Sequence, residues 1–166
     1  AKSIDLVRPG GVVAVITSKF TMDKGNAAFR KYIAERAELV GAIRLPNDAF
    51  LSNAGTQVTT DIIFLRKKED GESNTGESWL DVKNYTDKNG NTVPLNEYFV
   101  RHPENMLGDF GAYGSMYRDG EPALIKREGQ NTQELLDQAI ERLPKNIFKA
   151  DPSQNFEEVR ATVIRN

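Results

Sequence analysis

The sequence predicts an α/β fold, specifically half of a doubly wound sheet followed by an α+β extension of hairpins and helices. Residues 12–17 (VVAVIT) are almost entirely β-branched, which is typical of a central parallel strand covered on both faces. Residues 26–37 predict an amphipathic crossover helix. Its apolar face consists of Phe29, Tyr32, Ile33 and Ala37, and its polar face of Arg30, Lys31 and Glu35. Residues 39–45 and 58–65 are apolar runs that predict two further strands, which we expect to pair antiparallel.

A polar segment divides the chain into two parts. Residues 69–78 (EDGESNTGES) carry no apolar side chain and predict a flexible linker or surface loop. On this basis residues 1–68 form the α/β part and residues 79–166 form the α+β extension. Because half a sheet is not a free-standing domain, we expect the chain to be a fragment of a longer protein.

The extension contains two hairpin signals and two helix signals. Asn89-Gly90 predicts a two-residue type I′ turn, and Asp119-Gly120 predicts a second hairpin. Residues 131–143 predict the clearest helix, with a capping residue at its start and a proline just beyond its end. A short closing helix is predicted from three apolar side chains: Phe156, Val159 and Val163.

Composition narrows the class of protein. The 166 residues include no cysteine, which excludes disulfides and thiolate metal sites. No apolar run approaches the roughly 20 residues that span a bilayer, so we expect a cytoplasmic protein with no membrane contact. Residues 1–68 hold 11 basic and 6 acidic side chains (+5), and residues 69–166 hold 11 and 18 (−7). The basic part favours a polyanion such as nucleic acid, although ordinary solvated surface charge explains it equally well.

Three polar features suggest chemistry that the sequence does not support further. His102 is the only histidine, so neither a Ser-His-Asp triad nor a two-histidine metal site can form within this chain, and we expect a surface or capping residue. Residues 108–114 (GDFGAYG) lack the strand-then-helix context of a phosphate loop and are interpreted as a turn. Asp61 lies inside an apolar strand, where it is either functional or paired in a salt bridge.

Two longer stretches carry a family resemblance. RPGGVVAVITS, ELVGAIRLPNDAF and NAGTQVTTDIIFLRKK, within residues 1–68, resemble the carboxyl-terminal half of the catalytic domain of adenine-N6 DNA methyltransferases, the group that includes type I modification subunits. The later stretch LNEYFVRHPENMLGDFGAYGSMY resembles the region after the methylase in large methylase–helicase proteins of conjugative elements and phages. The distinctive pattern consists of Leu45, Pro46, Phe50, Gly55, Thr56, Thr59, Thr60 and residues 62–65.

The resemblance implies a Rossmann-like class I methyltransferase sheet in a bacterial enzyme that methylates a flipped adenine from S-adenosylmethionine. Base flipping needs an aromatic face, and Phe50 matches that position, with an alternative in which its ring folds back on the core. The same loop supplies the other base-binding candidates, Asn53, Gly55 and Thr56. The polar residues 18–26 predict a loop at the carboxyl end of the first strand, in which Lys19 and Lys24 are candidates for contacts to the DNA backbone. The basic run at residues 66–68 is interpreted as the solvated end of a strand.

The sequence also departs from the family. Adenine methyltransferases use an Asn/Asp/Ser-Pro-Pro-Tyr/Phe motif and a glycine-rich cofactor loop. The seven prolines of this chain are never adjacent, and no such glycine loop follows the first strand. We therefore expect both motifs in an upstream half. This chain alone is predicted neither to bind S-adenosylmethionine tightly nor to methylate DNA.

A different class of function remains open. Residues 79–166 could instead be a docking module that links a methylase to a helicase or DNA-recognition domain, and the alternative is a small core beneath two hairpins. An incomplete sheet would also expose apolar surface, which favours self-association. The aromatic side chains on which the docking hypothesis depends are Trp79, Tyr98, Phe99, Tyr113 and Tyr117.

Overall fold

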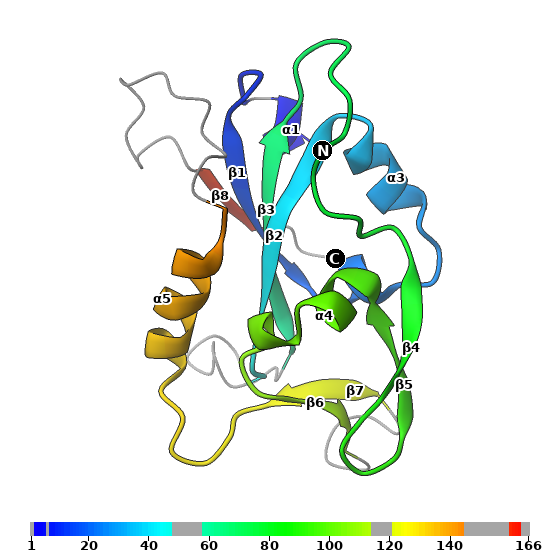
Figure 1. The fold of residues 1–166 in the computed structure, drawn as a ribbon, viewed down its shortest axis with the longest axis vertical. Coiled ribbons are helices and arrows are strands. Elements are labelled where there is room, and N and C mark those ends of the chain that lie inside the picture. Colours follow the sequence, from blue (N-terminus) through cyan, green and yellow to red (C-terminus); the bar gives the residue numbers. More distant parts are fainter. Residues whose placement is uncertain (1, 6, 48–57, 114–120, 145–159, 164–166) are drawn as a thin grey trace.

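The centre of the protein is a mixed four-stranded sheet. The computed structural model describes residues 2–5, 7–47, 58–113, 121–144 and 160–163. The strands lie in the order β2-β3-β1-β8 (Figure 1). β3 runs antiparallel to both β1 and β2, and β8 runs parallel to β1. The strands span Val12–Ser18 (β1), Ala37–Leu45 (β2), Thr60–Lys67 (β3) and Arg160–Val163 (β8).

The predicted strands form, with one correction to their direction. β1 has a neighbour on each side, as expected of a central strand, and the antiparallel pairing of β2 with β3 is confirmed. However, β1 is not flanked by parallel strands on both sides: β1, β2 and β8 run in the same direction, and the reversed strand β3 lies between β1 and β2. A β-branched run indicates a strand that is buried on both faces, and such a strand can pair with parallel or antiparallel neighbours.

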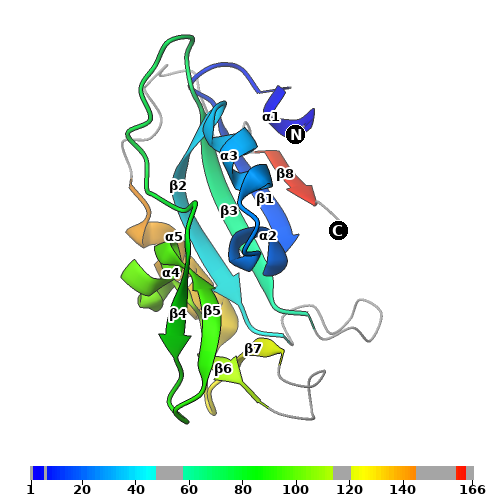
Figure 2. The ribbon, with the colours of Figure 1, turned by 90° about the vertical axis from the view of Figure 1, so that its right-hand side faces the viewer.

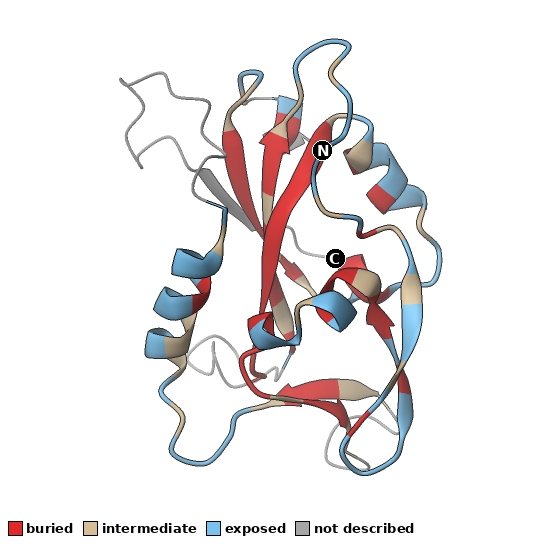
Figure 3. Ribbon diagram, viewed as in Figure 1, coloured by how far each residue is buried: buried red, intermediate tan, exposed pale blue. Residues whose placement is uncertain are grey.

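Both faces of the sheet are covered, and β2 is buried along its whole length (Figure 3). Ile63 and Leu65 of β3 point into the larger core, which also contains Val13, Met22 and Leu95. The alternate side chains of β3 pack beneath α5 (Thr132–Arg142) on the other face. The members of this second cluster are Ile43, Leu45, Ile62, Phe64, Leu107, Leu135, Leu136 and Ala139.

The segment after β1 is more ordered than the predicted loop. It contains a short helix, α2 (Phe20–Asp23), with buried side chains. The predicted crossover helix is confirmed as α3 (Ala28–Ala34), which is shorter than residues 26–37. Its predicted faces are partly wrong, because Phe29 is exposed and Arg30 is buried. Arg30 is accommodated by donating to Leu80 O, at 2.8 Å and 3.2 Å, and to Thr21 O at 3.1 Å.

Within the described residues, the extension forms two hairpins, a short α-helix, a 3₁₀ helix and α5 beside the sheet (Figure 2), and it adds strand β8 to the sheet itself. β4 (Val82–Thr86) pairs with β5 (Thr92–Asn96), which confirms the first hairpin. Its loop is longer than predicted, because Asp87 N donates to Asn91 O at 2.8 Å and three residues lie between them. The second hairpin pairs β6 (Asp109–Ala112) with β7 (Pro122–Ile125). GDFGAYG therefore contains a strand and not only a turn.

The other predicted elements of the extension agree only in part with the structure. The Asp119-Gly120 turn lies outside the described residues. α5 is confirmed, and its cap Asn131 accepts a hydrogen bond from Glu134 N at 3.1 Å. The predicted closing helix is wrong for Val163, which belongs to strand β8. Phe156 and Val159 lie outside the described residues. The remaining elements are α1 (Lys2–Asp5), α4 (Glu97–Arg101) and a 3₁₀ helix (Pro103–Asn105).

The two parts of the chain share one core. Val13 and Leu39 from the first part belong to the same hydrophobic cluster as Trp79 and Phe99 from the second. Residues 69–78 follow the sheet closely, and Glu77 N donates to Leu39 O at 2.9 Å. This contact favours the surface-loop alternative for residues 69–78. No helix among the described residues is long and apolar enough to cross a membrane.

Candidate functional site

The candidate site lies where β1 and β2 end and β3 begins. The chain leaves β2 at Leu45 and returns in β3 at Thr60, so residues 46–59 connect the two strands at this edge. The four base-binding candidates, Phe50, Asn53, Gly55 and Thr56, all fall within residues 48–57, outside the described residues. The structure describes the two ends of this connection, residues 46–47 and 58–59, which we call the loop stems.

Hydrogen bonds attach both loop stems to one residue of β7. Asn47 N donates to Leu124 O at 3.0 Å, and Leu124 N donates to Thr59 Oγ1 at 3.0 Å. The Thr59 hydroxyl also donates to Asn47 Oδ1, which joins the stems directly. On the other side, Lys19 N donates to Thr59 O at 3.0 Å. The stems are therefore fixed between the end of β1 and the β6–β7 hairpin.

Lys19 lies beside the loop stems but its side chain is largely buried. Its amine is 3.9 Å from Glu121 Oε1 and 3.9 Å from the centre of the Phe20 ring. Burial lowers the pKa of Lys19, and the charges of Asp23 and Glu121 partly oppose this shift. The second DNA-backbone candidate, Lys24, is exposed at the end of α2. Only Lys19 is brought to the candidate site through a described contact.

A buried ion-pair network lies behind this edge. Arg44 on β2 faces Asp61 on β3, with 2.7 Å between Nε and Oδ1 and 2.8 Å between Nη2 and Oδ2. Its third nitrogen, Nη1, donates to Asp23 Oδ2 of α2 at 2.8 Å. All three side chains are at most 4% exposed. The alternative of a salt-bridged Asp61 is therefore confirmed, and Arg44 and Asp23 are its unpredicted partners.

The network extends into the second part of the chain. Asp23 Oδ1 accepts from Asn96 N at 2.9 Å, and Asn96 Nδ2 donates to Met22 O and Trp79 O at 2.6 Å and 2.8 Å. The ring centres of Phe99 and Phe110 lie 4.5 Å and 4.9 Å from the Arg44 guanidinium carbon. These contacts give the network a structural role, because its charged groups are already paired with one another.

Burial and charge oppose each other within this network. Burial by itself lowers the pKa of Arg44, but Asp23 and Asp61 outweigh it and raise that pKa above its usual value. Burial raises the pKa of Asp61, and the guanidinium of Arg44 acts against this shift. The two-point geometry favours the ionised pair, since a carboxylate accepts both N–H groups of the guanidinium fork.

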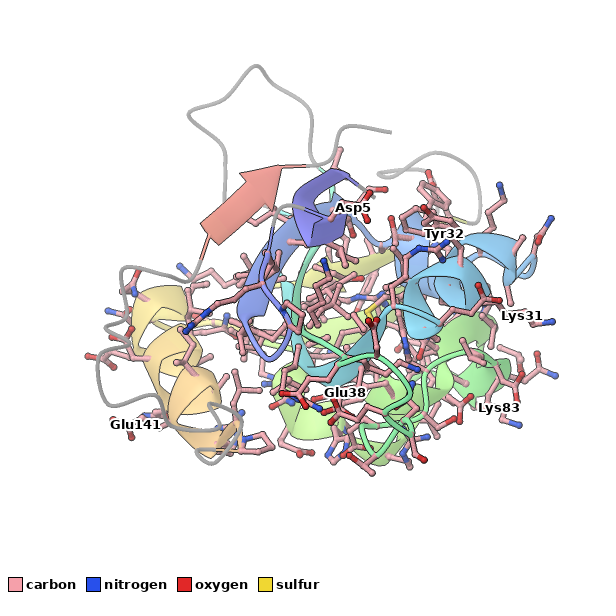
Figure 4. All side chains as sticks on the ribbon, turned by 90° about the horizontal axis from the view of Figure 1, so that it is seen from above. Asp5, Lys31, Tyr32, Glu38, Lys83 and Glu141 are labelled. Carbon is pink, nitrogen blue, oxygen red and sulfur yellow. The ribbon has the colours of Figure 1, made fainter. Side chains whose placement is uncertain are left out.

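A second ion pair corrects the prediction for the basic run at residues 66–68. Arg66 is only 4% exposed, whereas a solvated strand end was expected. Its Nε donates to Glu38 Oε1 at 2.6 Å, and its Nη2 pairs with Glu72. Glu38 lies beneath the 69–78 segment, where its other oxygen accepts from Thr75 N and Oγ1 at 3.0 Å (Figure 4). This pair ties the surface loop to β2 and β3.

The aromatic side chains proposed for docking are mainly core residues. Trp79, Tyr98 and Phe99 are at most 2% exposed, so they are core residues, but they belong to the large core shared with the sheet and not to a separate small core beneath the hairpins. Tyr113 is half-buried and donates to Asp109 O at 3.1 Å, while Tyr117 lies outside the described residues. His102 is a surface residue, as expected, with Nε2 2.9 Å from Glu77 and Nδ1 3.3 Å from Glu104.

The structure is that of a mixed α/β protein. Hydrogen bonds to Leu124 hold both loop stems at the end of the sheet where β1 and β2 finish. Residues 2–113 match the family model of the N-6 DNA Methylase, which is more than half of the chain, and the chain belongs to this family. It is also 33% identical over 67 residues to the "Defense against restriction protein B" of Escherichia phage P1. That match covers 40% of this chain and 3% of the phage protein. No solved structure gives a significant match.

Members of this family generally use S-adenosylmethionine, and the described residues do not fit that cofactor. Glycines with positive φ occur at positions 10, 71, 90 and 129, and none of them follows the carboxyl end of β1. That end continues through Lys19 into α2, whose last three side chains are buried. The nearby buried carboxylates of Asp23 and Asp61 are already paired with Arg44. No chemical step can therefore be assigned to a cofactor held by these residues.

Proposed function

We propose that this chain supplies the base-binding side of an S-adenosylmethionine-dependent adenine-N6 DNA methyltransferase. In this proposal the cofactor loop and the catalytic Pro-Pro motif belong to an upstream half of a longer protein, and DNA is the substrate. Membership of the N-6 DNA methylase family supports the reaction class. The short share of the phage relative that is matched is consistent with a part of a larger protein.

The attachment of both loop stems to Leu124 is the observation that carries the proposal. Residues 48–57 begin and end at fixed points on the carboxyl edge of the sheet, where α/β proteins place their ligands. A loop with fixed ends loses less conformational entropy when it receives a ligand than a free loop does.

Phe50 has the central role in this proposal. Its ring would stack on the unstacked adenine, and Asn53, Gly55 and Thr56 would line the same loop. The DNA backbone would contact Lys24, whose amine is exposed, more readily than Lys19, whose amine is buried beside Glu121. The chain would thus hold the target base while another part of the protein transfers the methyl group.

The proposal is tested by Phe50→Ala in the full-length protein that carries this sequence. Stacking is worth roughly 1–3 kcal/mol per base, so methyl transfer to unmethylated DNA should lose roughly 5- to 150-fold in kcat/KM. The matched control is Phe29→Ala, which removes an exposed ring from α3 and should leave kcat/KM unchanged. Unchanged methyl transfer by Phe50→Ala, with an unchanged melting temperature, would refute the role of this loop.

The proposal that the cofactor site and the catalytic motif lie outside this chain is tested separately. The 166-residue chain should transfer no methyl groups and should show no micromolar affinity for S-adenosylmethionine in calorimetry. Micromolar binding by the isolated chain would contradict the proposal that the cofactor site lies elsewhere. The docking alternative loses three of the five aromatic side chains on which it depends, because Trp79, Tyr98 and Phe99 are buried.

A further inference from the structure

The hydroxyl of Thr59 has two hydrogen bonds in a buried position at the base of the candidate loop. It donates to Asn47 Oδ1 on the other loop stem and accepts from Leu124 N at 3.0 Å. Thr59, Asn47 and Leu124 are 3%, 8% and 0% exposed, respectively. A buried hydroxyl is costly unless it is hydrogen-bonded, so this arrangement strongly favours one position of both stems.

Leu124 contacts the two stems through adjacent groups of one residue. Its N–H reaches Thr59 and its C=O accepts from Asn47 N at 3.0 Å. Thr59 and Leu124 are separated by 65 residues in the sequence. The position of the loop stems is therefore set by the β6–β7 hairpin as well as by the strands from which the loop emerges.

The hairpin is itself anchored to the rest of the protein. The Asp109 carboxylate at the start of β6 contacts Lys88 Nζ at 3.0 Å, and it also contacts Arg127 Nε at 2.9 Å just after β7, within the same hairpin. At the end of β6, Ala112 N donates to Asp87 Oδ2 at 3.0 Å. Because Lys88 and Asp87 belong to the turn between β4 and β5, the two hairpins brace each other. The loop stems are thus attached to a fixed part of the fold.

We infer that Thr59 is a positioning residue, whose hydroxyl holds the two stems of the base-binding loop in register with the β6–β7 hairpin. This inference rests on the proposed function of residues 48–57. Thr59 touches neither base nor cofactor in this role and acts through the loop that carries Phe50. The β6–β7 hairpin thereby contributes to base binding although it contains none of the residues that contact the base.

The experiment compares four variants of the full-length protein: Thr59→Val, Thr59→Ser, Phe50→Ala and the double variant Thr59→Val/Phe50→Ala. Valine keeps the shape of threonine but removes the hydroxyl, whereas serine keeps the hydroxyl. We expect Thr59→Val to lower kcat/KM for DNA by about fivefold or more, the effect of about 1 kcal/mol, and Thr59→Ser to stay within about twofold. The readouts are methyl transfer and the melting temperature of each variant.

The double variant separates positioning from a general structural effect. If Thr59 acts through Phe50, the valine substitution should have little further effect once the ring is absent. If Thr59→Val lowers kcat/KM by the same factor with and without the ring, or has no effect, the inference is wrong while the proposed function stands. If Phe50→Ala itself leaves kcat/KM unchanged, the proposed function fails. Should Thr59→Val not fold, Asn47→Ala removes the other end of the same hydrogen bond and replaces it in the comparison.

Discussion

Arg44 and Asp61 form a fully buried two-point ion pair across strands β2 and β3, with nitrogen–oxygen distances of 2.7 Å and 2.8 Å. The pair is completed by Asp23, which occupies the third nitrogen of the guanidinium at 2.8 Å. Two carboxylates and one guanidinium are thus held together at the end of the sheet, directly behind the connection that carries Phe50. Removing Arg44 would leave both carboxylates buried without their charged partner.

Arg44→Met should therefore destabilise the protein strongly. The loss of a partner from a buried pair costs about 3–5 kcal/mol, and urea denaturation would measure it. Arg127→Met is the matched control, because the Arg127–Asp109 pair is partly exposed (55% and 31%) and should cost less than about 1 kcal/mol. Equal losses in the two variants would show that the Arg44 network contributes no more than a surface pair.

Lys19→Met should stabilise the protein near neutral pH. Burial lowers the pKa of Lys19, so the folded protein releases this proton at a lower pH than the unfolded chain does. Stability should consequently rise as the pH increases from the lowered pKa towards the usual value of 10.5, because the unfolded state binds more protons there. The variant should lose this rise. A melting temperature that falls on substitution, with the same alkaline profile as the parent, would contradict the prediction.

Glu38 should contribute stability that is lost in acid. Burial alone raises its pKa, but hydrogen bonds from Arg66 and Thr75 outweigh this effect and lower the pKa below 4.5. The contribution is present above the usual pKa and disappears as the pH falls through the lowered value. Glu38→Gln should therefore be less stable than the parent at pH 7, and the difference should shrink below pH 4. Glu35→Gln, a change at a 74% exposed carboxylate, should shift the free energy of unfolding by less than about 0.5 kcal/mol at either pH.

Gly90→Ala should cost about 1–2 kcal/mol through backbone strain alone. Gly90 has a φ of +84° and nothing lies within 4 Å of an added Cβ, so no steric contact contributes. Gly25→Ala is the control, since its surroundings are equally open and its φ is not in the positive range. Thermal unfolding of the two variants should differ by the cost of the left-handed conformation. An equal melting temperature for both would show that the β4–β5 turn relaxes at no cost.

The sequence predicted the elements whose signals are local. β1, β2 and β3 were predictable because β-branched and apolar runs favour strands whatever their partners are. α5 and the β4–β5 hairpin were predictable because a capping asparagine and an Asn-Gly turn are each recognised from a few neighbouring residues. The family and the position of the candidate loop followed from the motif between Leu45 and Thr60, which is also a continuous stretch.

Only the tertiary structure decided which polar groups are buried and what they contact. Asp61 meets Arg44 17 residues away, Arg66 meets Glu38 28 residues away, and Leu124 meets Thr59 65 residues away. Local patterns carry no information about such partners, because strand register and packing determine which side chains become neighbours. For this reason the sequence predicted Arg30 and Arg66 on solvated surfaces, and it left residues 69–78 as either a flexible linker or a surface loop. The contact between Leu124 and Thr59 also holds one stem of the candidate loop. The sequence therefore predicted where this loop lies, but not which residues hold it in place.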